Sequence, residues 1–146
     1  LGALLAAGAQ DDKGAVISKL ETAANEATDP VLRDLARFKS VLAQGDSMDP
    51  AARDAALSEL SKPGAPFRLL ALEQKAVALV AADRRDDAVT LIREILVEDG
   101  VSQALRERLA GMMTALGEAP GANPALPDGA DPADDAGGAA PAAAAE

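Results

Sequence analysis

The sequence contains no cysteine, histidine, tryptophan or tyrosine, and phenylalanine occurs only twice among its 146 residues. Without cysteine, neither a disulfide framework nor a thiolate zinc site can form. Without histidine, the chain lacks the side chain that most often transfers protons near neutral pH. The acidic residues fall at predicted turns and exposed helix positions instead of converging in an apolar setting. We therefore expect no enzymatic activity, no catalytic residues, no cofactor and no metal site.

Long apolar runs and basic clusters are also missing. No stretch of 18 or more consecutive apolar residues occurs, whereas a membrane-spanning helix needs about 20. The chain has 24 acidic and 14 basic residues, which gives a net charge of −10. A predominantly acidic chain without a basic stripe or interleaved aromatic residues does not fit a nucleic-acid-binding protein. We therefore expect no nucleic acid among its partners.

The composition changes near residue 118 and divides the chain into two parts. Residues 118–146 are dominated by Ala, Pro, Gly and Asp and contain no basic or aromatic residue. Such a segment cannot bury enough apolar surface to offset the ordering of its backbone. We predict a helical-repeat domain over residues 1–117 and a disordered acidic tail over residues 118–146.

Residues 1–117 read as short helices separated by clear stop signals. Asp29-Pro30 and Asp49-Pro50 each combine a capping residue with proline at the first helical position. Gly117 can end the last helix in a left-handed conformation. No segment alternates with a period of two, so an all-α fold is predicted. The expected helices lie at about 2–8, 11–27, 30–44, 50–62, 66–82, within 83–100, and at 101–116.

Apolar residues at helical spacing predict which faces are buried. The 66–82 helix is the most apolar and is expected to be the most buried. The stripes expected to face the core are Val16, Leu20, Ala23 and Ala27; Val31, Leu35, Phe38 and Leu42; Ala88, Leu91, Ile92 and Ile95; and Leu105, Leu109, Met112 and Leu116.

The opening LGALLAAGAQDDKG can be read as the end of a secretion signal or as part of a buried helix. The run ALLAAGAQDD at 3–12 is similar to ALVAADRRDD at 78–87, with a weaker copy, VLAQGDSMDP, at 41–50. A cleavage site has no reason to recur within a domain, whereas spacings of 38 and 37 residues are typical of helical repeats. We predict a short tetratricopeptide-like solenoid of antiparallel helix pairs, closed by a C-terminal capping helix.

Four stretches carry a family resemblance: PVLRDLA at 30–36, LAQGDSMDPAARDAAL at 42–57, GAPFRLLALEQKAVALVAADRRDDAVTLIREIL at 64–96 and LRERLAGMMTALG at 105–117. They resemble the tetratricopeptide-like family of bacterial ancillary SecYEG translocon subunits (YfgM-like), in its alphaproteobacterial form. The similarity covers about residues 3–117. It implies one transmembrane helix upstream of Leu1 and a repeat domain on the periplasmic side of the bacterial inner membrane.

The resemblance implies a protein–protein interaction module without catalytic residues. Its implied partners are Sec translocon subunits, periplasmic chaperones and exported proteins, with the membrane contacted only through the missing N-terminal anchor. The alternative is a soluble helical-repeat scaffold or adaptor for another cell-envelope complex. An uncleaved apolar segment upstream favours the first hypothesis, and a cleavable signal favours the second.

Three arginines are the candidate protein-binding residues. In tetratricopeptide arrays the first helix of each pair lines the concave side, which nominates the 30–44 and 66–82 helices. Arg33 and Arg37 lie four residues apart on one face, and Arg68 follows Arg33 by 35 residues in a similar apolar-Arg-x-Leu-Ala setting. Equivalent arginines on successive repeats could bind peptide carbonyls or carboxylates through their forked donors.

A simpler interpretation gives these arginines neighbouring acidic partners, as is common on helix surfaces. Arg33 would then pair with Asp29, and Arg37 with Asp34. On the last helix, the side chains expected to point outward are Arg106 and Arg108.

Overall fold

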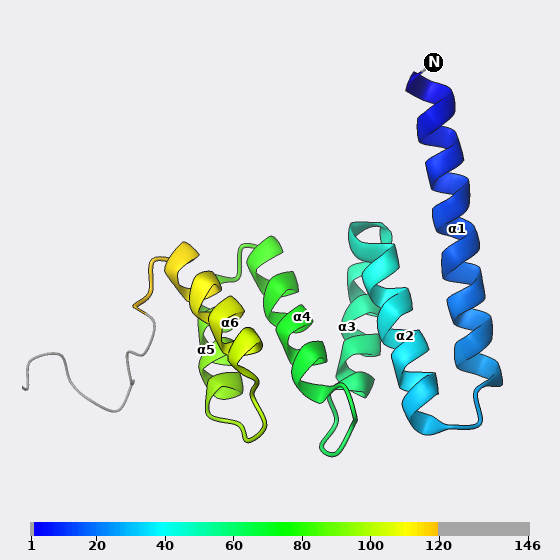
Figure 1. Ribbon diagram of the computed structural model, residues 1–146. Helices are drawn as coiled ribbons and strands as arrows, with labels where there is room; N and C mark the ends of the chain where they lie inside the picture. Colours follow the sequence, from blue (N-terminus) through cyan, green and yellow to red (C-terminus); the bar gives the residue numbers. More distant parts are fainter. Residues whose placement is uncertain (1, 120–146) are drawn as a thin grey trace, which may run out of the picture.

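The computed structural model of the protein describes residues 2–119, with side chains from residue 12 onward. Over this range the chain is helical, without a strand, so the predicted all-α fold is confirmed (Figure 1). Within the described residues, no helix is both long and apolar enough to cross a membrane. The elements are α1 (Gly2–Glu26), α2 (Pro30–Gln44), the 3-10 turn η1 (Gly45–Ser47), α3 (Pro50–Leu60), α4 (Arg68–Ala81), α5 (Arg85–Leu96) and α6 (Gln103–Ala115).

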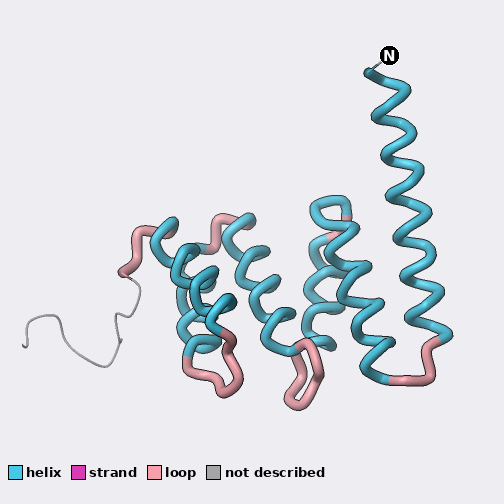
Figure 2. Tube along the Cα trace, in the orientation of Figure 1, coloured by secondary structure: helices cyan, strands magenta, loops and turns pink. Residues whose placement is uncertain are grey.

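The helices stand side by side in a row, with α1 at one end and α5 and α6 at the other (Figure 1). Short loops join them at alternating ends, so successive helices run up and down (Figure 2). The main contacts are between helices that follow one another in the chain. The N-terminal part of α1 extends beyond its neighbours.

The first helix corrects the expectation of two helices at 2–8 and 11–27. Residues Gly2–Glu26 form one continuous helix, which passes through Asp11 and Asp12 without a break. This stretch contains no proline, and its polar residues are compatible with a solvent-exposed helix. Gly14 is also tolerated, because glycine in a helix costs only about 1 kcal/mol relative to alanine.

The local start signals at Asp29 and Asp49 and the stop signal at Gly117 act as predicted. The Asp29 carboxylate accepts a hydrogen bond from the Val31 N–H at 2.8 Å and caps α2. Asp49 caps α3 by accepting from the Ala52 N–H at 3.1 Å. Gly117 adopts φ 79°, a left-handed conformation that glycine reaches without the steric cost of a Cβ atom. These signals are local in sequence, so they do not depend on how the helices pack.

The interior consists of two apolar clusters that share α4. The α2–α4 core contains Phe38, Val41, Leu57, Leu60 and Ala71. The α4–α6 core contains Ala76, Val89, Ile92, Ile95, Leu105, Leu109 and Met113. Helix α4 contributes a fully buried alanine to each core, and these small side chains let its neighbours approach closely. The two phenylalanines, Phe38 and Phe67, stack with ring centroids 6.3 Å apart and join α2 to the start of α4.

Buried positions of α2 and α3 recur in α4 and α5 after 35 residues. The buried pairs are Ala36 and Ala71, Phe38 and Glu73, Val41 and Ala76, Leu57 and Ile92, and Leu60 and Ile95. This spacing replaces the expected 37 and 38. The similarity between 3–12 and 78–87 does not mark equivalent structure, because the first segment lies within α1 and the second contains the turn before α5.

Several predicted stripes are displaced from the observed core. Val31 and Leu42 are 48% and 45% exposed, and Val16 is also exposed. Helix α2 has α1 on one side and α3 on the other, so it buries Ala36, Phe38, Ser40 and Val41 instead of one narrow stripe. In α6 the fully buried methionine is Met113, with Met112 at its edge.

The most apolar helix, α4, is not the most buried. Its buried residues are Ala71, Glu73 and Ala76, whereas Leu70, Val77 and Val80 are exposed. Helix α5 buries more of its length, at Ala88, Val89, Ile92 and Ile95. Part of the apolar surface of α4 is therefore left open to solvent.

Candidate protein-interaction surface

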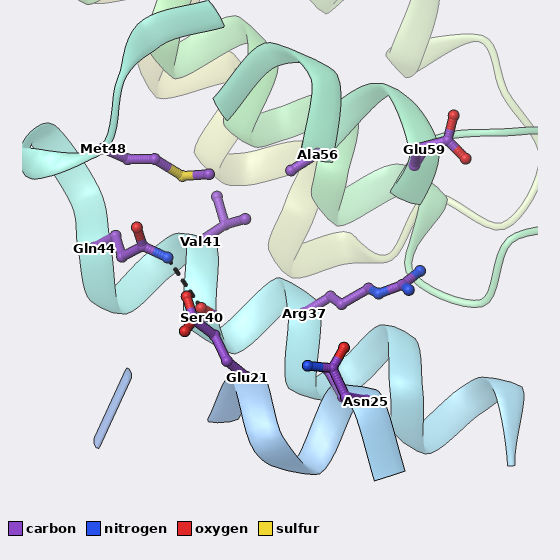
Figure 3. A pocket seen from close by; sticks show the side chains of 10 residues that line it. Glu21, Asn25, Arg37, Ser40, Val41, Gln44, Met48, Ala56 and Glu59 are labelled. Carbon is purple, nitrogen blue, oxygen red and sulfur yellow. Dashed lines mark hydrogen bonds between the residues drawn. The ribbon is translucent and has the colours of Figure 1, made fainter. Parts of the chain in front are cut away.

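A groove of about 570 Å³ opens between α1, α2 and the region around α3. The polar residues at its edges are Glu21, Asn25, Arg37, Gln44 and Glu59, and Val41 and Met48 contribute apolar surface. Figure 3 shows these side chains, which come from α1, α2, α3 and, for Met48, the turn before α3. We call this the polar groove.

Helix α2 supplies the residues that position the polar groove. Ser40 is buried, and its hydroxyl accepts a hydrogen bond from the Gln44 side-chain amide at 3.0 Å (Figure 3). This bond holds the Gln44 side chain in place, one helical turn from Ser40. Arg37 lies one turn earlier, and Figure 3 shows its side chain between Asn25 and Glu59. The Arg37 guanidinium, the Glu59 carboxylate and the Asn25 amide therefore all line the same groove.

The three predicted binding arginines do not line one groove. Arg37 is exposed and lines both the polar groove and an adjoining hollow of about 400 Å³. Arg33 lines only that hollow and donates to the Ala27 carbonyl at 3.2 Å. The Asp29 carboxylate caps α2 instead, so the predicted Arg33–Asp29 pair is not among the ion pairs of the described residues.

Arg68 is engaged in structural contacts at the base of α4. Its guanidinium donates two hydrogen bonds to the Glu98 carboxylate, one of them from Nε to Oε2 at 3.1 Å, and a third to the Ser61 carbonyl. Hydrogen bonding to Glu98 raises the pKa of the Arg68 guanidinium above its ordinary value. Arg33 and Arg68 are therefore equivalent in a structural sense, because each binds a carbonyl that follows the preceding helix.

An ion pair between α4 and α6 was not foreseen from the sequence. The Arg108 guanidinium donates two hydrogen bonds to the Glu73 carboxylate, at 2.6 and 2.9 Å. Glu73 is only 8% exposed, and its hydrogen bonds raise the pKa of Arg108. Arg108 is exposed, as expected of a side chain that points outward, but its guanidinium also pairs with the buried carboxylate of Glu73, which requires a charged partner. The signal was an acid within the apolar run LLALEQKAVALV.

A second cluster fastens the end of α6 to α5. Glu118 accepts hydrogen bonds from Arg85 at 2.7 Å and from Arg93 at 3.0 Å. Arg85 also donates to the Leu116 carbonyl at 2.8 Å. Glu118 had been assigned to the predicted tail, and residues 120–146 of that tail lie outside the described residues.

Comparison with protein-family models, curated proteins and solved structures finds no match to this chain. The resemblance to translocon subunits therefore stays a prediction. Among the side chains that the structure describes, no group of three or more acidic residues is placed to hold a metal ion. The charged residues with assigned contacts serve mainly as helix caps and ion pairs between elements.

Proposed function

We propose that the chain is a non-enzymatic protein-interaction module built on a tetratricopeptide-like array. The 35-residue spacing of buried positions supports this architecture, because tetratricopeptide units have about 34 residues. The buried alanines Ala36, Ala71, Ala76 and Ala88 also support it, because such arrays use small residues between packed helices. In this interpretation α2–α3 and α4–α5 are two units, and α6 covers the apolar side of the second.

The observation that carries the proposal is the polar groove. It extends over three helices and is open to solvent, which suits a polypeptide segment held by several contacts. Arg37, Asn25 and Gln44 offer donors for peptide carbonyls, while Glu21 and Glu59 offer acceptors for peptide N–H groups or basic side chains. Val41 and Met48 add an apolar surface for a partner side chain.

For the biological setting, we propose a periplasmic domain anchored in the inner membrane beside the Sec translocon. The support is the sequence resemblance over residues 3–117. A membrane anchor would raise the local concentration of the groove near emerging chains, so weak contacts would suffice. Translocon subunits, chaperones and exported proteins are the proposed partners. The alternative is a soluble scaffold for another envelope complex.

Photocrosslinking in the native organism tests both parts of this proposal. A photoreactive residue replaces Arg37 in the full-length protein, and a matched protein carries it at Glu94, an exposed position on α5. We expect translocon subunits or exported proteins to be captured at position 37 and not at position 94. Adducts with only a different envelope complex would support the scaffold. Adducts at position 94 alone would show that the polar groove is the wrong surface.

A further inference from the structure

A second groove, of about 360 Å³, lies between α4 and α6 and differs from the polar groove in its chemistry. Its lining is entirely apolar and consists of Val77, Val80, Ala81, Met112, Ala115 and Leu116. Val77 and Val80 are each 38% exposed. We call it the apolar groove. It accounts for much of the α4 surface that the described helices leave open.

The chain leaves the described region beside this groove. Leu116 lines the groove, and the described residues end three positions later at Ala119. The Arg85 and Arg93 contacts to Glu118 fix this exit point against α5. The sequence then continues for 27 residues, from 120 to 146. The chain that follows therefore starts next to an open apolar surface.

Only one large apolar residue occurs in that continuation. It is Leu126, in the sequence Asn-Pro-Ala-Leu-Pro at 123–127, and the other apolar residues are alanines and prolines. Leu126 follows Leu116 by ten residues, which can span up to about 35 Å when extended. The groove is therefore within reach. Every acidic residue of the continuation lies after Pro127, so Leu126 can be buried without burying a charge.

We propose that residues 123–127 bind in the apolar groove of their own chain, with the Leu126 side chain between α4 and α6. Burial of Leu126 against Val77, Val80 and Met112 removes apolar surface of both partners from water. Pro124 and Pro127 have no N–H group, so binding leaves fewer backbone donors to be satisfied. The short connection makes this binding intramolecular, which favours it over capture of another chain.

The consequence is a second interaction surface that is normally covered by the protein itself. A foreign apolar segment could use the apolar groove only by displacing residues 123–127. The all-apolar lining offers no polar side chain to bind a phosphate, a metal ion or a nucleotide. The inference does not depend on the partner of the polar groove, since the two grooves share no lining residue.

A spin label combined with methionine methyl NMR tests this proposal on the full chain. The protein lacks cysteine, so Ala130→Cys provides a unique labelling site, and its only methionines are Met48, Met112 and Met113. We expect the label to remove most of the Met112 methyl intensity. The Met48 methyl, which packs on the α2–α4 core, should keep its intensity.

The deciding variant is Leu126→Ser in the same labelled chain, with Pro141→Ser as the matched control. Leu126→Ser should restore most of the Met112 intensity, and Pro141→Ser should leave the broadening unchanged. Equal broadening with and without Leu126 would overturn the proposal. A mixture of isotope-labelled chains without spin label and spin-labelled chains without isotope gives a further check. Strong broadening of Met112 in that mixture would show that a second copy supplies the segment, which also contradicts binding within one chain.

Discussion

At the scale of single residues, the contact between Glu73 and Arg108 joins a buried carboxylate to an exposed guanidinium. A buried carboxylate that loses its partner keeps its desolvation penalty, whereas removal of both charges leaves none. Phe38 lies 35 residues before Glu73 and is also buried, so an apolar side chain is accommodated at the corresponding position of α2. The ion pair with Arg108 therefore compensates for the charge of Glu73 on the otherwise apolar buried face of α4.

We expect Arg108→Met to lower the urea midpoint of unfolding, and Glu73→Leu combined with Arg108→Met to recover most of the loss. The control is Arg106→Met, which changes an exposed arginine on the same helix and should leave the midpoint unchanged. If the double variant were as unstable as Arg108→Met, the buried carboxylate would not be the cause.

Arg37 has the opposite character, because it is exposed and faces the polar groove. We expect Arg37→Glu, in protein without a photoreactive residue, to reduce recovery of co-purified partners about tenfold, the usual effect of losing a charged contact worth about 1.4 kcal/mol. The free energy of unfolding should change by less than about 0.5 kcal/mol, as for other surface substitutions. Arg106→Glu carries the same charge change on α6. If it reduced recovery equally, the effect would come from net charge and not from the groove.

At the scale of helices, the repeat of buried positions predicts equal roles for equivalent residues. Leu57 and Ile92 are both fully buried, and they lie 35 residues apart on α3 and α5. We expect Leu57→Ala and Ile92→Ala each to lower the free energy of unfolding by about 3 kcal/mol, through lost burial and a residual cavity. Val97→Ala, at an exposed position after α5, is the control. Urea denaturation monitored by circular dichroism measures all three. A loss below about 1 kcal/mol at either site would contradict the equivalence.

Local signals made the helices predictable, and long-range contacts made their packing hard to predict. Asp29, Asp49 and Gly117 act within one turn, so their roles can be read from adjacent residues. The sequence did not predict a continuous α1, because Asp11-Asp12 resembles the capped start of a new helix. Only the structure shows that the helix continues through these residues. The choice of Met113 over Met112 depends on the direction from which α4 and α5 approach α6. The spacing of apolar residues along α6 does not show from which side the other helices pack against it.

The candidate site was predictable to the same limited extent. Arg37 was selected from its position on the face of a first helix, and it lies in a groove. Arg68 was selected by the same reasoning, but Glu98 binds it from a loop 30 residues away. A charge without a neighbour in sequence can still have a partner in the fold. The similar sequence around Arg33 and Arg68 therefore correctly indicated that the two arginines are equivalent. Their shared role is to bind a backbone carbonyl after the preceding helix.

At the scale of the whole molecule, contacts between sequential helices make the array nearly one-dimensional. Helix α4 contributes residues to both the α2–α4 core and the α4–α6 core. A cavity in one core should therefore weaken its own helices more than those at the far end. Amide hydrogen exchange of the two alanine variants tests this. Leu57→Ala should reduce protection mainly in α2 and α3, and Ile92→Ala mainly in α5 and α6. Uniform loss in both variants would indicate a single cooperative unit.

The extension of α1 beyond its neighbours gives a separate prediction about the same measurement. An isolated helical segment shorter than about 12–15 residues is marginal in water. We expect amides in the part of α1 that extends past α2 to exchange much faster than those near Ala24, which is buried against the array. Slow exchange along the whole of α1 would mean that another surface covers its N-terminal part.

The 35-residue spacing also makes the length of this protein adjustable by whole units. Removal of residues 36–70 would join Leu35 directly to Ala71, which occupies the place of the buried Ala36. The helix that results would begin with the Asp29 cap of α2 and continue with the buried face of α4. Duplication of the same residues would add one further pair of helices and extend the row. The number of helix pairs in such a chain can thus change by deletion or duplication within a helix, without a new fold having to arise.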